Sequence, residues 1–180
     1  SGAVRLAGEA ALRTGAGLVS VATRPEHAAV IAAACPELMS HGVSQPLQLR
    51  PFLEKASVIM VGPGRGRSGW ARARLAAVLQ TRQPRVIDAD SLKVIAAQPH
   101  PLRQQVLTPH PGEAAHLLNQ ATAAIQADRL LAARAISQQY GGTTVVNGAG
   151  SVLQPNEGTP VVCAAGNPGV ATAGSGDVLS

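Results

Sequence analysis

The stretch RVIDADSLKVIAAQPHPLRQQVLTPHPGE, residues 85–113, predicts a strand that ends in an acidic turn at 85–90. A short helix is expected over 91–97, and a second strand enters a turn at 105–113. A strand, a helix and another strand in direct succession are typical of a parallel sheet covered by helices. This stretch therefore indicates an α/β fold.

The same alternation extends from this stretch to both ends of the chain. Further helices and strands are predicted over 2–17, 18–23, 24–35, 56–64, 69–80 and 124–140. Antiparallel strands joined by a glycine turn are expected over 143–153 and 159–163, with loops at 47–53 and 154–159. With no linker or repeat in between, the sequence predicts one α/β unit over residues 1–180, with a mostly parallel central sheet flanked by helices.

The composition excludes several classes of protein. Of the 180 residues, 46% are hydrophobic, yet no apolar run reaches the ~20 residues that span a bilayer, and no signal peptide precedes the first helix. We therefore expect a cytoplasmic protein without a membrane partner. The net charge of +5 comes from scattered arginines without interleaved aromatics, which argues against a nucleic-acid partner. Cys35 and Cys163 lack metal-ligand spacing and are interpreted as thiols in a reducing compartment.

Glycine-rich or acidic turns follow the predicted strands. They are GPGRG at 62–66, DAD at 88–90, TPHPGE at 108–113, NGAGS at 147–151 and AGSGD at 173–177. In an open parallel sheet, ligands bind at the carboxyl ends of the strands. Glycine lets backbone N–H groups approach such a ligand closely. The five turns together predict a binding site at one sheet edge.

The last of these turns carries the clearest chemistry. Small residues before Asp177 direct backbone N–H groups at a phosphate or an oxyanion, and the carboxylate can take a proton from a substrate hydroxyl. A tight turn with Asp177 as a helix cap is the structural alternative. Ser175 lacks the G-x-S-x-G pattern of a hydrolase and a histidine downstream of it. No dinucleotide fingerprint and no P-loop occurs in the sequence.

Two further positions stay open at this stage. His110 lies between two prolines directly after a strand, where both a structural role and a ligand role are consistent with the sequence. In the DAD turn, Asp90 is interpreted as a helix cap, whereas the role of Asp88 is left undecided.

Six segments of the chain together resemble one enzyme family. They are GAVRLAGEAALRTGAGLVSVAT (2–23), VGPGRG (61–66), VIDADSL (86–92), LTPHPGEAAHLL (107–118), NGAGSVL (147–153) and GNPGVATAGSGDVLS (166–180). Their order and spacing resemble the ADP-dependent NAD(P)H-hydrate dehydratases, the carboxy-terminal half of bifunctional nicotinamide-nucleotide repair enzymes. The resemblance implies a ribokinase-like fold and a lyase that restores NADH and NADPH from the S-epimers of their hydrates, NADHX and NADPHX.

The resemblance also implies how the reaction proceeds and which residues take part in it. Phosphate from ADP is placed on the hydrate hydroxyl and is then eliminated, with Mg²⁺ as the expected metal and its ligands unassigned. Asp177 would be the base that contacts the hydrate, in a pocket lined by Ala3, Gly66 and His110. The residues expected to hold the nucleotide are Asn147, Gly148, Ala149, Gly150, Ser151 and Gly176.

The sequence departs from the family pattern at three places. Asn147 and Ser151 replace the lysine and threonine of the usual K-G-A-G-T segment. A charge-assisted contact is worth ~1.5 to 3 kcal/mol, so nucleotide affinity falls roughly tenfold to a hundredfold unless an arginine compensates. The glycine-bearing strand before the SGA start and the helices after GSGDVLS are missing, so we expect a domain truncated at both ends and poorly active or insoluble in isolation.

Two other functions are also consistent with the sequence. A ribokinase-superfamily kinase that phosphorylates a vitamin precursor shares the G-x-G-D turn, and an inactive nucleotide-binding fragment is suggested by Asn147. An epimerase domain upstream and a homo-oligomer both remain open.

Overall fold

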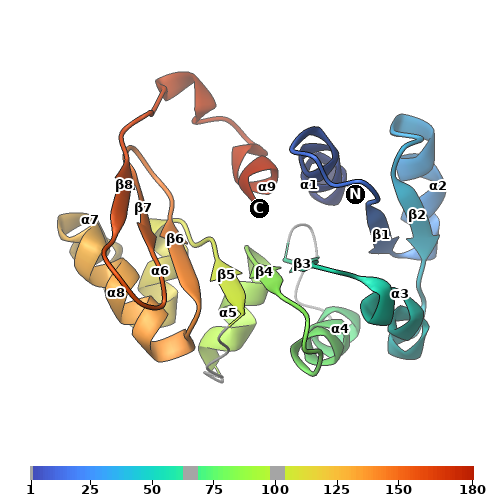
Figure 1. The fold of residues 1–180 in the computed structure, drawn as a ribbon, viewed down its shortest axis with the longest axis horizontal. Helices are drawn as coiled ribbons and strands as arrows, with labels where there is room; N and C mark the ends of the chain where they lie inside the picture. Colours follow the sequence, from blue (N-terminus) through green and yellow to red (C-terminus); the bar gives the residue numbers. More distant parts are fainter. Residues whose placement is uncertain (1, 63–68, 98–103) are drawn as a thin grey trace.

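The computed structural model describes residues 2–62, 69–97 and 104–180, which form two β-sheets with helices around them (Figure 1). The larger sheet has the strand order β3-β4-β5-β6-β7-β8. Its strands are β3 (Ile59–Val61), β4 (Arg85–Ile87), β5 (Gln105–Leu107), β6 (Thr143–Val146), β7 (Ser151–Gln154) and β8 (Val161–Cys163). Strands β3 to β6 are parallel, and β7 is antiparallel to both β6 and β8. The predicted fold, a mostly parallel sheet with an antiparallel end, is confirmed.

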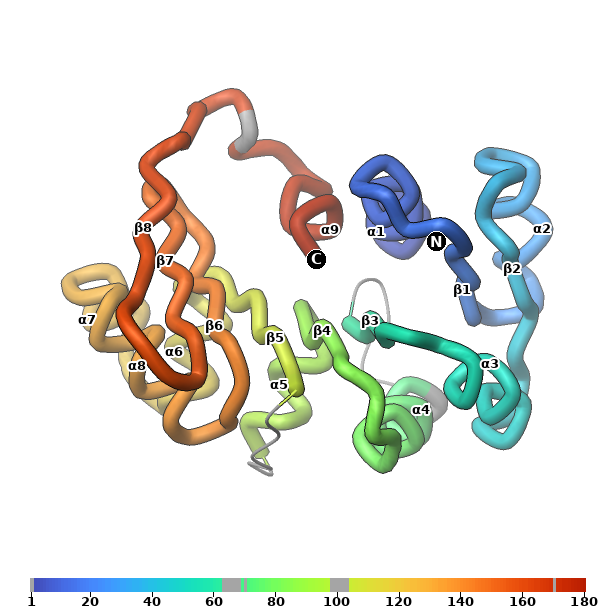
Figure 2. The backbone as a smooth tube through the Cα atoms, in the orientation of Figure 1, coloured from blue at the N-terminus to red at the C-terminus, as the bar shows by residue number. Residues whose placement is uncertain are grey.

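Two strands form a separate small sheet near the start of the chain. β1 (Ser20–Thr23) and β2 (Met39–Gly42) pair in parallel, and α2 (Pro25–Ala34) connects them (Figure 2). The sequence did not predict β2, because MSHG carries no run of β-branched or aromatic residues. Its pairing with β1 makes it a strand.

Helices pack on the larger sheet and bury its apolar residues. These helices are α4 (Gly69–Leu79), α5 (Asp90–Ala97), α6 (Pro111–Leu118), α7 (Thr122–Ala127) and α8 (Arg129–Tyr140). Two other helices, α1 (Gly2–Arg13) and α9 (Ser175–Leu179), pack against each other. Ile87, Leu107 and Val146 each contribute one fully buried side chain from β4, β5 and β6. They belong to one core cluster with Leu92 of α5 and Ile136 of α8. This core fixes the strand ends in position.

Two predictions about loops and helices were wrong. The segment expected as a loop at 47–53 forms a 3₁₀ helix, η1 (Pro46–Leu49), followed by α3 (Arg50–Lys55), each with a proline in its first turn. The helix expected over 124–140 is divided into α7 and α8 at Asp128. There the backbone leaves the helical region, and the Asp128 carboxylate accepts a hydrogen bond from the N–H of Leu131 at 2.8 Å.

The end of the chain also differs from the expectation. A helix was expected only after GSGDVLS, whereas α9 begins inside this motif at Ser175. Gly174 makes the turn before it with a φ of +91°, so Asp177 lies in the first turn of a short helix. In Figures 1 and 2, α9 lies beside α1. Within residues 2–62, 69–97 and 104–180, none of the helices has both the length and the apolar character to cross a bilayer.

Candidate active site

The carboxyl ends of the parallel strands lie side by side and are joined by backbone hydrogen bonds. The N–H of Asp88, just after β4, donates to the carbonyl oxygen of Val61 at 3.0 Å. One strand further, the N–H of Thr108 donates to Ile87 at 3.3 Å. The N–H of Asn147, after β6, donates to Pro109 at 2.9 Å. The carboxyl ends of β3, β4, β5 and β6 therefore share one edge of the sheet.

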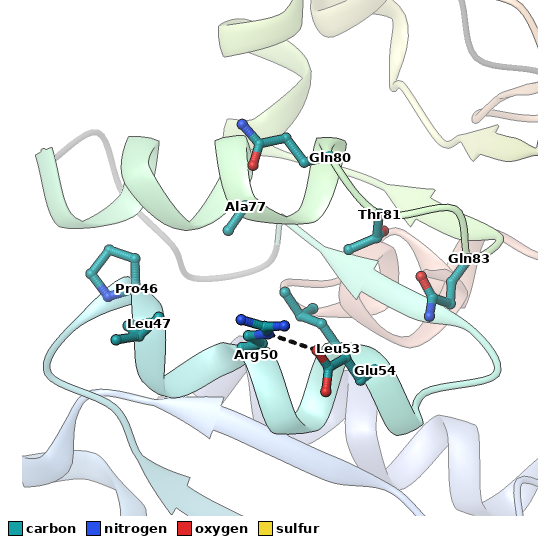
Figure 3. A pocket seen from close by; sticks show the side chains of 9 residues that line it. All are labelled: Pro46, Leu47, Arg50, Leu53, Glu54, Ala77, Gln80, Thr81 and Gln83. Carbon is teal, nitrogen blue, oxygen red and sulfur yellow. Dashed lines mark hydrogen bonds and ion pairs between the residues drawn. The ribbon is translucent and has the colours of Figure 1, made fainter.

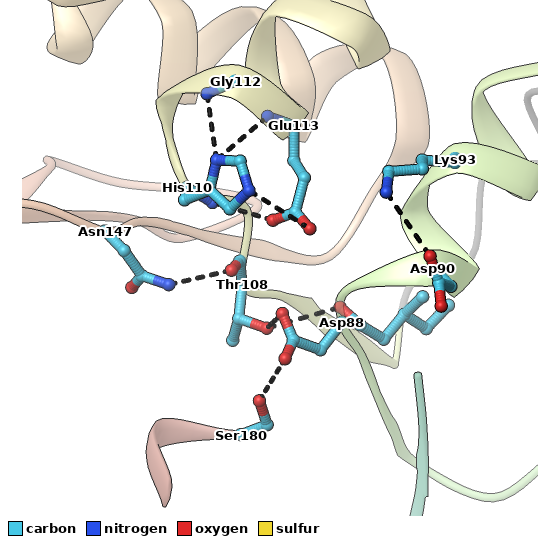
Figure 4. A network of polar contacts seen from close by, with 10 residues as sticks. Asp88, Asp90, Lys93, Thr108, His110, Gly112, Glu113, Asn147 and Ser180 are labelled. Atoms are coloured by element: carbon cyan, nitrogen blue, oxygen red, sulfur yellow. Dashed lines mark hydrogen bonds and ion pairs between the residues drawn. The ribbon is translucent and has the colours of Figure 1, made fainter. Parts of the chain in front are cut away.

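Asp88 connects three elements at this edge. Its side chain is buried, and its Oδ1 accepts a hydrogen bond from the hydroxyl of Thr108 at 2.8 Å (Figure 4). Its Oδ2 accepts a hydrogen bond from the hydroxyl of Ser180, directly after α9. Asp88 thus ties the end of α9 to the ends of β4 and β5, and it brings the Asp177 helix to the sheet edge.

Asp177 lies half-buried in the first turn of α9. Burial raises the pKa of its carboxyl group, and the negative charge of Asp88 raises this pKa further. The start of this helix lies close to α1. A Cβ added at Gly174, just before α9, would lie only 2.7 Å from Cδ1 of Leu6 in α1. A carboxylate with a raised pKa is a stronger proton acceptor than one in water.

His110 caps helix α6, which follows β5. Its Nδ1 accepts hydrogen bonds from the N–H groups of Gly112 at 3.0 Å and Glu113 at 3.3 Å (Figure 4). In return, Glu113 Oε2 accepts from the N–H of His110 at 3.1 Å, and its Oε1 lies 3.5 Å from His110 Nε2. Burial raises the pKa of Glu113. The structural role that the sequence left open for His110 is therefore present.

The turn 147–151 lies between β6 and β7 at the same edge. Asn147 Nδ2 donates to the carbonyl oxygen of Thr108 at 2.9 Å, whereas its buried Oδ1 has no hydrogen-bond partner among the described residues. Gly148 has a φ of +149°, and its carbonyl oxygen accepts from the Ser151 hydroxyl at 3.2 Å. The guanidinium group of Arg129 donates to the carbonyl oxygen of Ala149.

The structure brings most of the predicted site residues to this edge. Asp177, His110 and the turn 147–151 lie there, and Gly176 is exposed beside Asp177 in α9. Ala3 lies in α1, the helix that packs on α9. Gly66, the remaining predicted pocket residue, is outside the described residues.

The sequence analysis missed four residues at this edge. They are Thr108, Glu113, Arg129 and Ser180. For Glu113 a signal was available, because a proline followed by an acidic residue in the first turn is a helix-start pattern.

A surface groove elsewhere contains none of the predicted site residues. It has a volume of about 500 Å³, lies between α3 and α4, and contains the ion pair of Arg50 with Glu54 (Figure 3). In the part of the chain that the structure describes, no group of three or more His, Cys, Asp and Glu side chains is arranged to hold a metal ion. The site is therefore best described by its carboxylates and its glycine turns.

Comparison with known proteins gives a consistent result over the whole chain. Residues 1–180 match the family described as NAD(P)H-hydrate dehydratase. The bifunctional NAD(P)H-hydrate repair enzyme of Coxiella burnetii is 48% identical over 179 residues, which cover 99% of this chain and 37% of that enzyme. The ADP-dependent (S)-NAD(P)H-hydrate dehydratase of Neisseria meningitidis is 36% identical over 188 residues, covering 99% and 62%.

A solved structure agrees with these relatives. The ADP/ATP-dependent NAD(P)H-hydrate dehydratase of Bacillus subtilis, co-crystallised with ATP and Mg²⁺ and soaked with CoA, superimposes with a TM-score of 0.84 at 26% identity. The superposition covers 99% of this chain and 66% of that one. The chain thus spans little more than a third of the Coxiella relative and about two thirds of the solved structure.

Proposed function

Because the chain belongs to the NAD(P)H-hydrate dehydratase family, we propose that it dehydrates the S-epimers of NADHX and NADPHX with ADP as phosphoryl donor. It is then a hydro-lyase that returns damaged cofactor to use. The observation that carries the proposal is the half-buried Asp177 in α9, the helix that Ser180 ties to Asp88 at the edge that also holds the turn 147–151. A proton acceptor and a glycine turn for phosphate are the two components that the reaction requires.

In the proposed reaction, Asp177 accepts the proton of the hydrate hydroxyl while that oxygen attacks the terminal phosphoryl group of ADP. AMP leaves, and the hydroxyl oxygen becomes part of a phosphate ester. The C–O bond of this ester then breaks, inorganic phosphate departs with the electron pair, and the neighbouring ring carbon loses a proton to water to restore the double bond. The products are NADH or NADPH, AMP and inorganic phosphate.

The nucleotide is proposed to bind at the turn 147–151, with Gly176 from α9 beside it. Gly148 and Gly150, with φ of +149° and +68°, have no side chain that would keep phosphate oxygens away from the backbone. In this proposal, the hydrate lies against Asp177, Ala3, Gly66 and His110. Mg²⁺ would help to neutralise phosphate charge, but the described residues form no metal centre of their own and we assign no step to it.

An epimerase domain is a further part of this proposal. The Coxiella relative is named a bifunctional repair enzyme, and this chain covers 37% of it. We propose that an epimerase domain in the same longer protein supplies the S-epimer to this site.

The direct test incubates the purified protein with the S-epimer of NADHX and ADP. We expect absorbance to appear at the reduced-nicotinamide band, with one AMP released for each NADH formed. A phosphorylated alcohol that accumulates without NADH would instead identify a small-molecule kinase. Binding of ADP by calorimetry, with neither product formed, would identify an inactive nucleotide-binding protein.

Replacing Asp88 with asparagine is expected to shift the pH profile of kcat/KM. Asp177 must be deprotonated to act as a base, so activity is lost as the pH falls through its pKa. Because the charge of Asp88 raises that pKa, removing it lowers the pKa and moves the acid limb of the profile to lower pH. The measurement is kcat/KM across the acid range for both proteins.

A matched control separates charge from hydrogen bonding. Thr108→Val removes the hydroxyl that donates to Asp88 Oδ1 but keeps the negative charge beside Asp177. Its acid limb should not move to lower pH. If Asp88→Asn leaves the limb in place, or if both variants move it equally downward, the charge of Asp88 does not tune Asp177.

A further inference from the structure

Arg129 lies directly on the glycine turn that follows β6. It is the first residue of α8, and its Nη2 donates a hydrogen bond to the carbonyl oxygen of Ala149. A Cβ added at Gly148 would lie only 2.6 Å from Arg129 Nη1. A glycine at 148 therefore gives the guanidinium group the room to reach the turn.

Arg129 keeps most of its hydrogen-bonding capacity. A guanidinium group has five N–H donors. Within residues 2–62, 69–97 and 104–180, the hydrogen bond to Ala149 is the one that this guanidinium group donates. Across the same residues, no carboxylate forms an ion pair with it. The charge on this half-buried side chain is thus available to an anion at the turn.

The residue at the strand end cannot supply that charge. Asn147 is neutral, and its Nδ2 is bonded to the carbonyl oxygen of Thr108 at 2.9 Å. The side chain at position 147 therefore brings no positive charge to the turn. Arg129 brings a cation to the same turn from a different element, the start of helix α8.

We propose that Arg129 binds the phosphate groups of the adenine nucleotide at the turn 147–151. This inference rests on the proposed function, which locates the nucleotide at this turn. A planar guanidinium group suits the task because two of its N–H groups can bond two phosphate oxygens at once. Arg129 is thereby a determinant of nucleotide affinity that selects for phosphorylated adenosine.

Arg129→Gln tests the proposal through the number of phosphates on the ligand. Calorimetry with ADP, AMP and adenosine is compared for the wild-type protein and the variant. We expect ADP to bind roughly tenfold to a hundredfold more weakly, AMP to lose less, and adenosine to be unaffected, because the lost contact is to phosphate. Arg129→Lys keeps the charge and should recover part of the ADP affinity.

The control is Arg134→Gln, which removes the same charge from an exposed position of the same helix. It should leave ADP binding unchanged. Equal losses for ADP and adenosine in Arg129→Gln would overturn the proposal, because they would mean that Arg129 only holds the turn through Ala149. If the wild-type protein binds none of the three ligands, the proposed nucleotide site itself is wrong, which is a separate result.

A lysine placed at position 147 provides a second, independent readout. Asn147→Lys should improve ADP binding more in the Arg129→Gln protein than in the wild-type protein, because one cation then replaces the other. Equal gains in both backgrounds would show that the two positions act on different parts of the ligand, and would overturn the assignment of Arg129 to the phosphate groups.

Discussion

Replacing Asp177 with asparagine is expected to lower the turnover of NADHX by roughly 100-fold to 10,000-fold, the usual contribution of a positioned base. Asparagine keeps the size of the side chain but cannot accept the hydroxyl proton. The carboxylate is favoured as a base because burial and the neighbouring Asp88 raise its pKa. Binding of ADP should stay close to that of the wild-type protein, since the nucleotide is proposed to bind mainly at the turn 147–151.

The measurements are kcat from the appearance of NADH, and the dissociation constant of ADP from calorimetry. Glu157→Gln makes the same chemical change at an exposed position of the loop after β7, and it should leave both quantities unchanged. An Asp177→Asn protein that turns over NADHX at the wild-type rate would refute the role of this residue as the base.

Replacing Gly62 with alanine is expected to destabilise the fold by roughly 3 to 5 kcal/mol, at the upper end of single substitutions. Gly62 is buried after β3 and has a φ of +149°, which is strained for any residue with a side chain. A Cβ there would lie 2.0 Å from the carbonyl oxygen of Asp88. That atom cannot move away freely, because the N–H of Asp88 is bonded to Val61.

Two other glycines separate the causes of this loss. Gly15 has a φ of +107° and nothing within 4 Å of an added Cβ, so Gly15→Ala measures backbone strain alone. Gly17 has neither feature, and Gly17→Ala should be close to neutral. Denaturant unfolding of the three variants gives the comparison. If Gly62→Ala costs no more than Gly15→Ala, the contact with Asp88 contributes nothing.

The parallel strands and their common edge could be predicted because their signals are local. Strands β3, β4 and β5 are each short apolar runs that end at a glycine, an aspartate or a proline-rich turn. Once the strands are parallel, their carboxyl ends lie at one edge, so the turns after them converge. The elements found correctly are those in which pattern and packing agree.

The division between α7 and α8 could not be predicted in this way. Residues 124–140 contain no glycine or proline, so their pattern indicates a single helix. At the break, the carboxylate of Asp128 accepts a hydrogen bond from the N–H of Leu131. In a continuous helix a backbone carbonyl would accept that hydrogen bond instead, so both arrangements satisfy this N–H. For this reason the sequence analysis did not single out Arg129. The sequence predicts Arg129 in the interior of a helix, whereas in the structure it is the first residue of α8.

The role of His110 could not be decided from the sequence alone. A histidine after a strand indicates a ligand or a structural residue equally well, and only the partners of its two ring nitrogens decide between them. In the structure Nδ1 is engaged by two N–H groups and Nε2 faces Glu113. Such partners come from the tertiary arrangement of α6, and composition does not encode them.

With both nitrogens engaged by α6, the imidazole of His110 has a flat π surface left to offer a ligand. Its side chain is still 61% exposed, while its ring nitrogens are held in place by contacts within α6. A nicotinamide-type ring packed against it would cost little side-chain entropy of His110, because the orientation of the imidazole is already set. His110 would then discriminate between ligands by the shape of their ring, and proton transfer would be carried out by Asp177.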